Sequence, residues 1–363
     1  MNLLLIKPSS LGDVLHGIPA AQAIKKLKPD CKLTWLVNAA FEPLLRLVPG
    51  VDEVLIFDRG GWKNPGDFFQ NLKKLRDLVG ELRARKFDAV LDLQGLFRSG
   101  FLAWATGAPR RMGLSNAREG SSLFYTDLAD TLGKAHAVDK NMAAVKALFP
   151  NEPLPEARFE LKTPQAIHDK VSAILRNLNV REPFCLLAPG ARWISKKWPA
   201  HHFWELAKNI LSARGTDVVL IGDNADEKEW EQRLKEAPPG IFSLLGKTSL
   251  LELTEVIRRA EFLLCNDSGP MHLAVAVGTK AFVLMGPTDP AKTGPYHFPN
   301  RVAAAPGSGA TGANAEVIRL GLPCSPCLQR LCPRTDNKDE CLKMISPEDV
   351  LKKLVGVSIG IKS

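Results

Sequence analysis

Asp13 lies in the segment KPSSLGD, which directly follows the apolar run at the N-terminus. Ser10 can cap a helix that starts here, and Gly12 lets the backbone pass close to a ligand. A carboxylate in the first turn of a helix is stabilised by the helix dipole, and an ionised aspartate can accept a proton from a hydroxyl group. The segment therefore indicates a general base. The alternative is that Asp13 is only a helix-start acid.

A basic loop, GARWISKKWP, follows a second apolar run. Gly190 ends the run, and Arg192, Lys196 and Lys197 place three cations within six residues. Such a loop can hold a diphosphate leaving group, because cations stabilise the negative charge that develops there. The alternative is a solvated basic loop.

Acidic side chains open the helix that we expect after the strand-like run 217–222. Asp223, Asp226 and Glu227 stand at the position where an acid accepts hydrogen bonds from ribose hydroxyls in nucleotide-binding α/β domains. Helix capping by Asp223 or Asn224 is the alternative explanation.

The segment NDSGPMH follows a third apolar run and opens a helix at its proline. Free backbone N–H groups at Ser268, Gly269 and the helix start form an anion site suited to phosphate, with Asp267 and His272 beside it. The next predicted strand ends in GPTDP, at the same edge of the sheet. Two loops that converge on one edge make this the most specific of the four segments.

Four cysteines near the C-terminus form a separate group: Cys324, Cys327, Cys332 and Cys341. Their spacing matches no standard ligand pattern, and three prolines make the segment a tight loop. A structural metal, reduced thiols and a disulfide-stapled loop all remain open.

Predicted strands and helices alternate along the chain, and each of the four loop segments described above follows a predicted strand. Short apolar runs separated by helical stretches predict parallel sheets covered on both faces. The runs are 2–6, 32–37, 53–57 and 87–93, then 184–188, 217–222, 241–245, 262–265 and 281–285. We therefore expect two doubly wound α/β domains, 1–165 and 166–363, joined by the Pro-rich and charged stretch 149–165.

Composition and charge narrow the class of protein. The 363 residues are 45% apolar and 24% charged, which excludes a disordered chain or a fibre. The net charge of +9 favours anionic partners, but no nucleic-acid-binding signature is present and the key loops carry acids. With no signal-peptide core and no membrane span in the sequence, we expect a cytosolic protein.

The motifs together resemble the family 9 glycosyltransferases, the ADP-heptose:lipopolysaccharide heptosyltransferases of Gram-negative bacteria. The resemblance rests on SSLGDVLH, FDAVLDLQGLFRS, SKKWP, NDSGPMHLA and GPTDP, in the family's order and over nearly the whole chain. The N-terminal half is most similar to heptosyltransferase I, through SSLGDVLH, NAREGSSLFY and HAVDKN. The C-terminal half, with NDSGPMHLA and CSPC, is closer to heptosyltransferase II.

The resemblance implies a GT-B fold, with two facing Rossmann-like domains, the acceptor on the first and the ADP-sugar on the second. It implies an inverting transfer without cofactor or essential metal, in which Asp13 is the general base and Lys196 contacts the donor phosphates. Asp226 stands where the family has a ribose-binding Glu. The other matching donor positions are Thr248, Asp267, Ser268, Gly269 and His272. The acceptor positions are Arg59, Lys63, Arg98, Arg118 and Lys140, with Ser10 beside Asp13. The last helix, near 347–356, is expected to cross back to the first domain.

The resemblance also implies the partners: ADP-heptose, Kdo-lipid A, and the inner face of the cytoplasmic membrane as a peripheral contact. The alternatives are a heptosyltransferase II or III that extends a heptosylated core and, more remotely, a nucleotide-sugar-binding protein or epimerase. No acid lies between Asp92 and Glu119, whereas four arginines do: Arg98, Arg110, Arg111 and Arg118. We interpret this basic stretch as a surface for a phosphorylated glycolipid.

Overall fold

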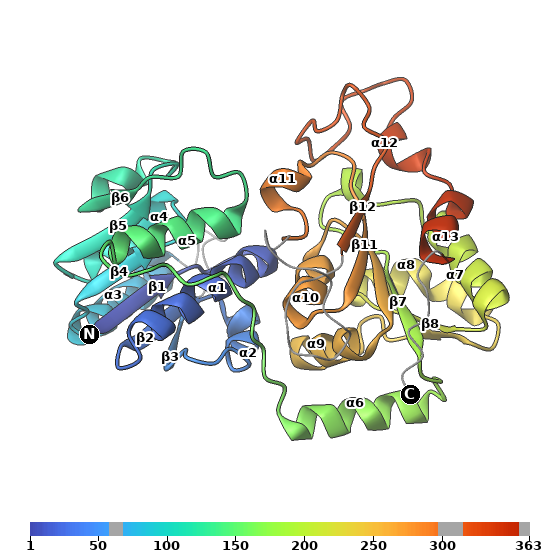
Figure 1. Ribbon diagram of the computed structural model, residues 1–363, viewed down its shortest axis with the longest axis horizontal. Coiled ribbons are helices and arrows are strands. Elements are labelled where there is room, and N and C mark those ends of the chain that lie inside the picture. Colours follow the sequence, from blue (N-terminus) through green and yellow to red (C-terminus); the bar gives the residue numbers. More distant parts are fainter. Residues whose placement is uncertain (58–67, 297–314, 356–363) are drawn as a thin grey trace. The chain divides into compact units, whose positions relative to one another are not determined.

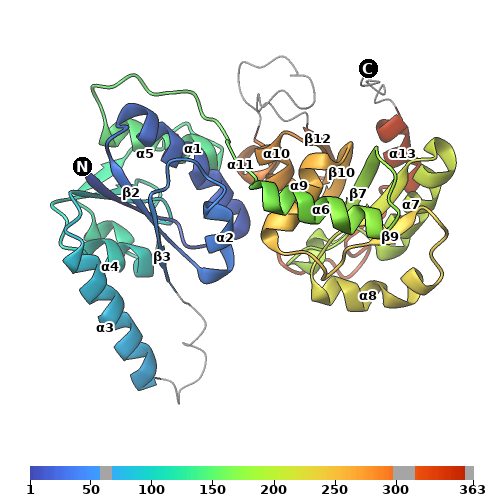
Figure 2. The same cartoon turned by 90° about the horizontal axis from the view of Figure 1, so that it is seen from below.

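The computed structural model describes residues 1–57, 68–296 and 315–355, and it divides into two compact units (Figure 1). The units are Met1–Lys162 and Thr163–Ser363. The expected boundary was at 165/166. The observed boundary precedes α6 (Gln165–Asn177), whose Val171 and Leu175 are buried. Because α6 packs against α9 (Leu250–Arg259), as Figure 2 shows, it belongs to the second unit.

The first unit is a six-stranded parallel sheet with helices on it, in the spatial order β3-β2-β1-β4-β5-β6. Leu3 to Ile6 of the central β1 are fully buried, because a parallel sheet is covered on both faces. The strands are β1 (Asn2–Ile6), β2 (Lys32–Val37), β3 (Glu53–Ile56), β4 (Ala89–Asp92), β5 (Arg110–Leu114) and β6 (Asp127–Ala129). The helices are α1 (Leu11–Leu27), η1 (Ala39–Phe41), α2 (Glu42–Leu45), α3 (Phe68–Ala84), α4 (Phe97–Ala105), η4 (Ser121–Phe124) and α5 (Ala137–Leu148).

The second unit repeats this topology, with parallel strands in the order β12-β11-β10-β7-β8-β9. Counted from its own first strand, each sheet has the order 3-2-1-4-5-6 of dinucleotide-binding Rossmann domains. The strands are β7 (Phe184–Ala188), β8 (Asp217–Leu220), β9 (Ile241–Ser243), β10 (Phe262–Asn266), β11 (Lys280–Leu284) and β12 (Ala315–Ile318). The other helices are η5 (Ile194–Lys196), α7 (Ala200–Arg214), α8 (Asn224–Lys235), α10 (Gly269–Val277), α11 (Pro290–Thr293), α12 (Glu340–Lys343) and α13 (Pro347–Val355).

The last helix was expected to belong with the first domain, but the structure places α13 in the core of the second unit. It packs against α7 (Figure 1), and its Val350 and Leu354 are fully buried in the core of the second unit. These apolar side chains, four residues apart on one face, attach the helix to its own unit.

The strand order fixes where a ligand can bind in each unit. The order in which successive strands are added to the sheet reverses between β1 and β4 in the first unit and between β7 and β10 in the second. At such a switch point the loops leave in opposite directions and open a crevice at the carboxyl ends of the strands. The loops after these four strands carry most of the chemistry-bearing residues of the sequence.

Candidate functional site

Asp13 occupies the switch point of the first unit, in the first turn of α1. The backbone N–H and the hydroxyl of Ser10 donate to Asp13 Oδ2 at 2.8 and 2.9 Å. The Asp13 side chain is 42% exposed. The two hydrogen bonds orient the carboxylate while its side chain stays partly exposed, which is an arrangement that suits a general base.

Lys7 is a site residue that sequence reasoning missed. It follows β1, its side chain is buried, and its Nζ lies 3.9 Å from Asp13 Oδ1 and donates to the carbonyl of Leu93 at 2.6 Å. Burial lowers the pKa of Lys7, whereas the negative charges of Asp13 and Asp92 raise it and the charge of Arg118 lowers it further. Lys7 is the first residue of the KPSSLGD segment, and its place directly after a buried strand was the available signal.

Asp92 ends β4 on the other side of the switch point and is fully buried. Burial raises the pKa of its carboxyl group, although four hydrogen bonds oppose the shift. Tyr125 donates to Asp92 Oδ2 at 2.6 Å, and the N–H groups of Gln94 and Gly95 donate to Oδ1. The two backbone hydrogen bonds hold the loop after β4 in place. Asp92 thus has a structural role, and its negative charge also acts on Lys7.

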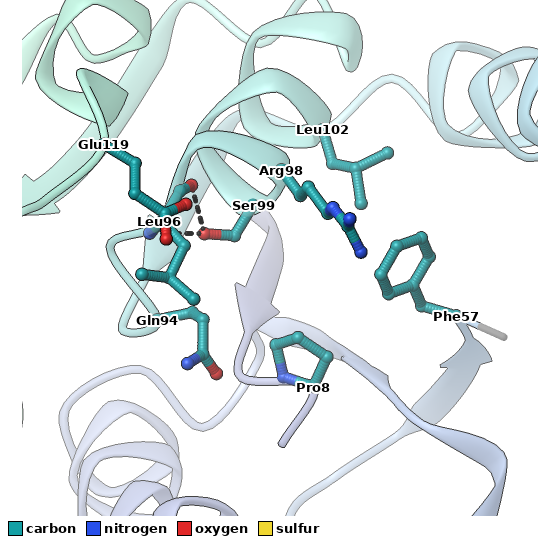
Figure 3. Close-up of a pocket in the computed structure, with 8 residues that line it drawn as sticks. All are labelled: Pro8, Phe57, Gln94, Leu96, Arg98, Ser99, Leu102 and Glu119. Carbon is teal, nitrogen blue, oxygen red and sulfur yellow. Dashed lines mark hydrogen bonds between the residues drawn. The ribbon is translucent and has the colours of Figure 1, made fainter. Parts of the chain in front are cut away.

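A pocket of about 220 Å³ lies next to this switch point (Figure 3). Pro8 and Gln94 reach it from the loops after β1 and β4, and Arg98 and Leu102 reach it from α4. Figure 3 shows the Arg98 guanidinium directed toward Phe57. The Glu119 carboxylate also lines the pocket, which therefore combines one cation and one anion with apolar walls and suits a polar group attached to a larger ligand.

The predicted acceptor residues are distributed unevenly. Ser10, Arg98 and Arg118 are exposed, and Lys140 is half-buried on α5. Arg118 is linked to the loop after β4, because its N–H donates to the Gly95 carbonyl at 2.8 Å. Arg59 and Lys63 lie outside the described residues.

Two arginines of the basic stretch have structural partners, which corrects the interpretation of that stretch. The Arg110 guanidinium donates to the carbonyls of Ala147 and Leu148 at the end of α5. The Arg111 guanidinium donates to the carbonyls of Ala108 and Phe124. Carbonyls at helix ends lack intrahelical donors, so these cations complete the local fold. Arg98 and Arg118 are the two cations of this stretch that remain exposed.

Lys196 and Asp267 meet at the switch point of the second unit. Lys196 Nζ lies 2.7 Å from Asp267 Oδ2 and 4.7 Å from the centre of the Trp193 ring. The side chains are 16% and 5% exposed, and the Thr288 hydroxyl donates to the same Asp267 oxygen. The lysine is therefore held in one orientation at the carboxyl edge of the sheet.

Asn266 joins the two loops of this switch point. Its side-chain amide donates to the Pro189 carbonyl at 2.7 Å, and its Oδ1 accepts the Trp198 N–H at 3.0 Å. The Trp198 indole donates to the Ile345 carbonyl at 2.9 Å. Because the amide is fully buried, this bridge fixes the loop that carries Lys196.

Asp226 is packed between glycine backbones at the start of α8. It accepts the Asp223 N–H at 3.1 Å, and burial raises its pKa. Lys197 Nζ lies 3.9 Å from Asp226 Oδ1 and 2.7 Å from Glu229 Oε2. The structure thus brings Asp226 and Lys197 together. The capping alternative is confirmed for Asp223, whose side chain accepts the N–H groups of Ala225 and Asp226 at 2.8 and 3.0 Å.

Position 190 requires glycine if Asp226 is to keep its place, because a Cβ at this position would lie 2.1 Å from Asp226 Oδ2. We expect Gly190→Ala to lower the free energy of unfolding by about 1–3 kcal/mol, measured by urea denaturation. The control is Gly80→Ala on α3, where a Cβ meets nothing within 4 Å and a gain of about 0.5–1 kcal/mol is expected. Equal stability of the Gly190→Ala protein and the wild type would contradict this packing.

The remaining residues predicted to bind the donor lie on loops or helix starts that follow strands of the two sheets. Ser268 is the N-cap of α10, Gly269 is the first residue of that helix, and His272 is buried in its first turn. Thr248 is half-buried before α9, and Arg192 is exposed in the loop after β7. In the first unit, Gly12 is the second residue of α1.

The four C-terminal cysteines carry free thiols. Within the described parts of the chain, no group of three or more His, Cys, Asp or Glu side chains is arranged to hold a metal ion. Burial, and next the neighbouring thiols, raise the pKa of Cys341 to about 11, so its thiol is protonated at neutral pH. Nor does any helix within residues 1–57, 68–296 and 315–355 have the length and apolarity to cross a bilayer.

Two Rossmann-type units with polar and charged side chains at their switch points are typical of nucleotide-binding α/β proteins. The chain belongs to glycosyltransferase family 9 (heptosyltransferase), whose family model matches residues 75–337. It is an enzyme of the heptosyltransferase class, and the predicted α/β GT-B fold is confirmed.

Similar proteins cover nearly the same length. Lipopolysaccharide heptosyltransferase 1 of Pseudomonas aeruginosa is 27% identical over 98% of this chain and 97% of its own. Lipooligosaccharide heptosyltransferase 2 of Campylobacter jejuni is 26% identical, over 97% of both chains. The structure of ADP-heptose lps heptosyltransferase II from E. coli has a TM-score of 0.75 at 23% identity, covering 98% of both chains.

Proposed function

We propose that this enzyme transfers L-glycero-D-manno-heptose from ADP-heptose to the Kdo-lipid A inner core of lipopolysaccharide, as a heptosyltransferase I. Family membership and the full-length likeness to enzymes named lipopolysaccharide heptosyltransferase 1 support the reaction class. The observation that carries the proposal is the Asp13 carboxylate, which Ser10 orients at the switch point of the first unit while it stays open to solvent.

In the proposed mechanism, Asp13 takes the proton from an acceptor sugar hydroxyl. The hydroxyl oxygen attacks the anomeric carbon of the heptose as the bond from that carbon to the ADP oxygen breaks, and the configuration inverts. Lys196 and the N–H groups at the start of α10 stabilise the negative charge on the departing ADP. Asp226, Thr248 and His272 are proposed to contact the adenosine, and the exposed Arg98 and Arg118 to contact the anionic acceptor.

The acceptor is the part of the proposal with a specific alternative, because relatives named heptosyltransferase 2 also match this chain. The test is ADP release from ADP-heptose with Kdo2-lipid A and, separately, with its monoheptosylated form. A type I enzyme is expected to prefer the first acceptor by kcat/KM. Preference for the second acceptor would make the chain a type II or III enzyme. We propose that the reaction takes place at the cytoplasmic face of the inner membrane, where the enzyme is peripheral.

Lys7 is proposed to position Asp13. Replacing Lys7 by Met removes a positive charge 3.9 Å from Asp13 Oδ1. Because the carboxylate is partly exposed, solvent screens the pair, and we expect kcat to fall by about 2–5-fold while KM for ADP-heptose stays near its wild-type value. Asp92 and Arg118 are the other charges that act on Lys7, and both remain in the variant.

The control is Lys7→Arg, which keeps the charge and is expected to keep kcat near its wild-type value. If Lys7 had a purely structural role, its replacement would lower stability without this separate loss of kcat. An unchanged kcat in a folded Lys7→Met protein would therefore contradict the positioning role.

A further inference from the structure

Helix α4 divides its side chains between two neighbouring faces. Arg98 and Leu102, four residues apart, line the pocket of Figure 3. Phe97, Phe101 and Trp104 follow the spacing i, i+4, i+7, so they form a second row along the helix. One nine-residue helix thus carries an aromatic row directly beside the pocket.

The short helix η4 extends this aromatic row, because it packs against α4. The Phe124 ring lies 5.2 Å from Phe97 and 6.2 Å from Phe101, and Phe101 lies 5.9 Å from Trp104, measured between ring centroids. Phe97 is 51% exposed, Trp104 49% and Leu123 of η4 87%. We call Phe97, Phe101, Trp104, Leu123 and Phe124 the aromatic patch.

Exposed cations border the aromatic patch. Arg98 lies within α4, Arg118 precedes η4, and Arg83 of the neighbouring α3 (Figure 2) donates to the carbonyl of Ala105 at the end of α4. Among the described residues, neither Arg98 nor Arg118 forms an ion pair. The border therefore offers positive charge around an apolar centre.

The acids of the same region are engaged by local partners. Glu81 pairs with Arg85 at 2.8 Å, and Asp127 lies 4.0 Å from Arg110. Glu119 accepts the N–H of Phe97 at 3.2 Å and keeps its negative charge beside the patch. Glu81 and Asp127 have cations beside them, so among the described residues the exposed Arg98 and Arg118 outnumber the one uncompensated carboxylate of Glu119 at this border.

We propose that the aromatic patch seats on the surface of an anionic lipid bilayer. A cluster of exposed apolar side chains marks an interaction surface. Trp, Phe and Leu lie at the boundary between headgroups and acyl chains, and Arg side chains at that depth meet lipid phosphates. Seated this way, α4 holds the pocket at the height where a membrane lipid displays its headgroup. The inference rests on the proposed function for this last step, since it supplies the lipid-linked acceptor.

Flotation of the full-length protein with vesicles tests the proposal without any acceptor present. The vesicles contain phosphatidylethanolamine and phosphatidylglycerol, with phosphatidylcholine vesicles as the neutral comparison. We expect the wild type to float with the anionic vesicles, and less so as salt screens the charges. The variant Trp104→Ser with Leu123→Ser is expected to bind at least about tenfold more weakly.

The matched control is Leu331→Ser with Met344→Ser, two side chains of the second unit that are each 64% exposed. It is expected to bind vesicles like the wild type. Absence of wild-type binding, or equal binding by both double variants, would overturn the proposal. So would a patch variant that changes only the molecular mass in light scattering, because the patch would then join copies of the chain.

Activity assays separate this proposal from the proposed function. The patch variant is expected to turn over a deacylated, soluble acceptor at the wild-type rate and to lose activity on acceptor embedded in vesicles. An equal rate on both forms of acceptor would overturn the membrane role of the patch. A wild-type enzyme with no turnover of either form would contradict the proposed function, while flotation would still decide on the membrane contact.

Discussion

Replacing Asp13 by Asn is expected to lower kcat by about 10²–10⁴-fold while ADP affinity stays within about twofold of wild type. Asn has nearly the same shape, and its side-chain oxygen can still accept the N–H of Ser10, which donates to Asp13 at 2.8 Å. It cannot take a proton from the acceptor hydroxyl. The measurement is steady-state ADP release together with ADP binding by calorimetry.

The chain offers a matched control for the loss of a capping carboxylate. At the start of α13, the Ser346 hydroxyl donates to Asp349 at 2.9 Å, as the Ser10 hydroxyl does to Asp13. Asp349→Asn therefore removes a similar capping charge at another helix, and we expect unchanged kcat. Near-wild-type turnover by the Asp13→Asn protein would end the assignment of Asp13 as the base.

Replacing Lys196 by Met is expected to weaken ADP binding by about 10–100-fold and to lower kcat as well. The lysine is proposed to donate to the diphosphate, and a hydrogen bond to a charged group contributes about 1.5–3 kcal/mol. The change also leaves Asp267, whose side chain is 5% exposed, without its cation, so some stability is lost. Calorimetry gives the ADP affinity, and urea denaturation gives the stability.

Lys170→Met separates the two effects. Lys170 pairs with Glu252, a carboxylate that is also 5% exposed, at the start of α9 rather than at the switch point. We expect this variant to lose stability while its ADP affinity stays at the wild-type value. If Lys196→Met also left ADP affinity and kcat unchanged, Lys196 would not belong to the phosphate site.

The sequence predicted the central strands of both sheets because these strands are apolar on both faces. Leu3–Ile6 and Leu263–Cys265 are fully buried and read as continuous apolar runs. The edge strands β6 and β12 were missed, since they are short and partly exposed. Strand β5 was missed because it begins with Arg110 and Arg111, which serve α5 and neighbouring carbonyls rather than the surface.

The candidate site was predictable where a motif follows a strand, and less so where a contact crosses the sheet. Asp13 and Lys196 were chosen as candidates because functional loops in doubly wound sheets follow strand ends, and the structure places both residues there. The contact of Lys7 with Leu93 joins residues 86 apart in the sequence, so no local pattern signals it. The Lys196–Asp267 pair likewise depends on β7 and β10 being neighbours.

The net charge of +9 has several local meanings rather than one. Arg110 and Arg111 complete the fold through backbone carbonyls, and Lys7 is buried beside Asp13. Arg98 and Arg118 remain exposed near the pocket and the aromatic patch. Of these cations, Arg98 and Arg118 are the two that fit the expectation of a surface for an anionic glycolipid.

Mass spectrometry of the acceptor after incubation with ADP-heptose tests the central claim most directly. The enzyme is expected to add one heptose to Kdo2-lipid A and to release one ADP for each heptose transferred, with no ADP formed when the acceptor is omitted. ADP release that does not depend on the acceptor, or an acceptor whose mass stays unchanged while the donor is consumed, would contradict the assignment of this chain as a heptosyltransferase acting on the lipopolysaccharide core.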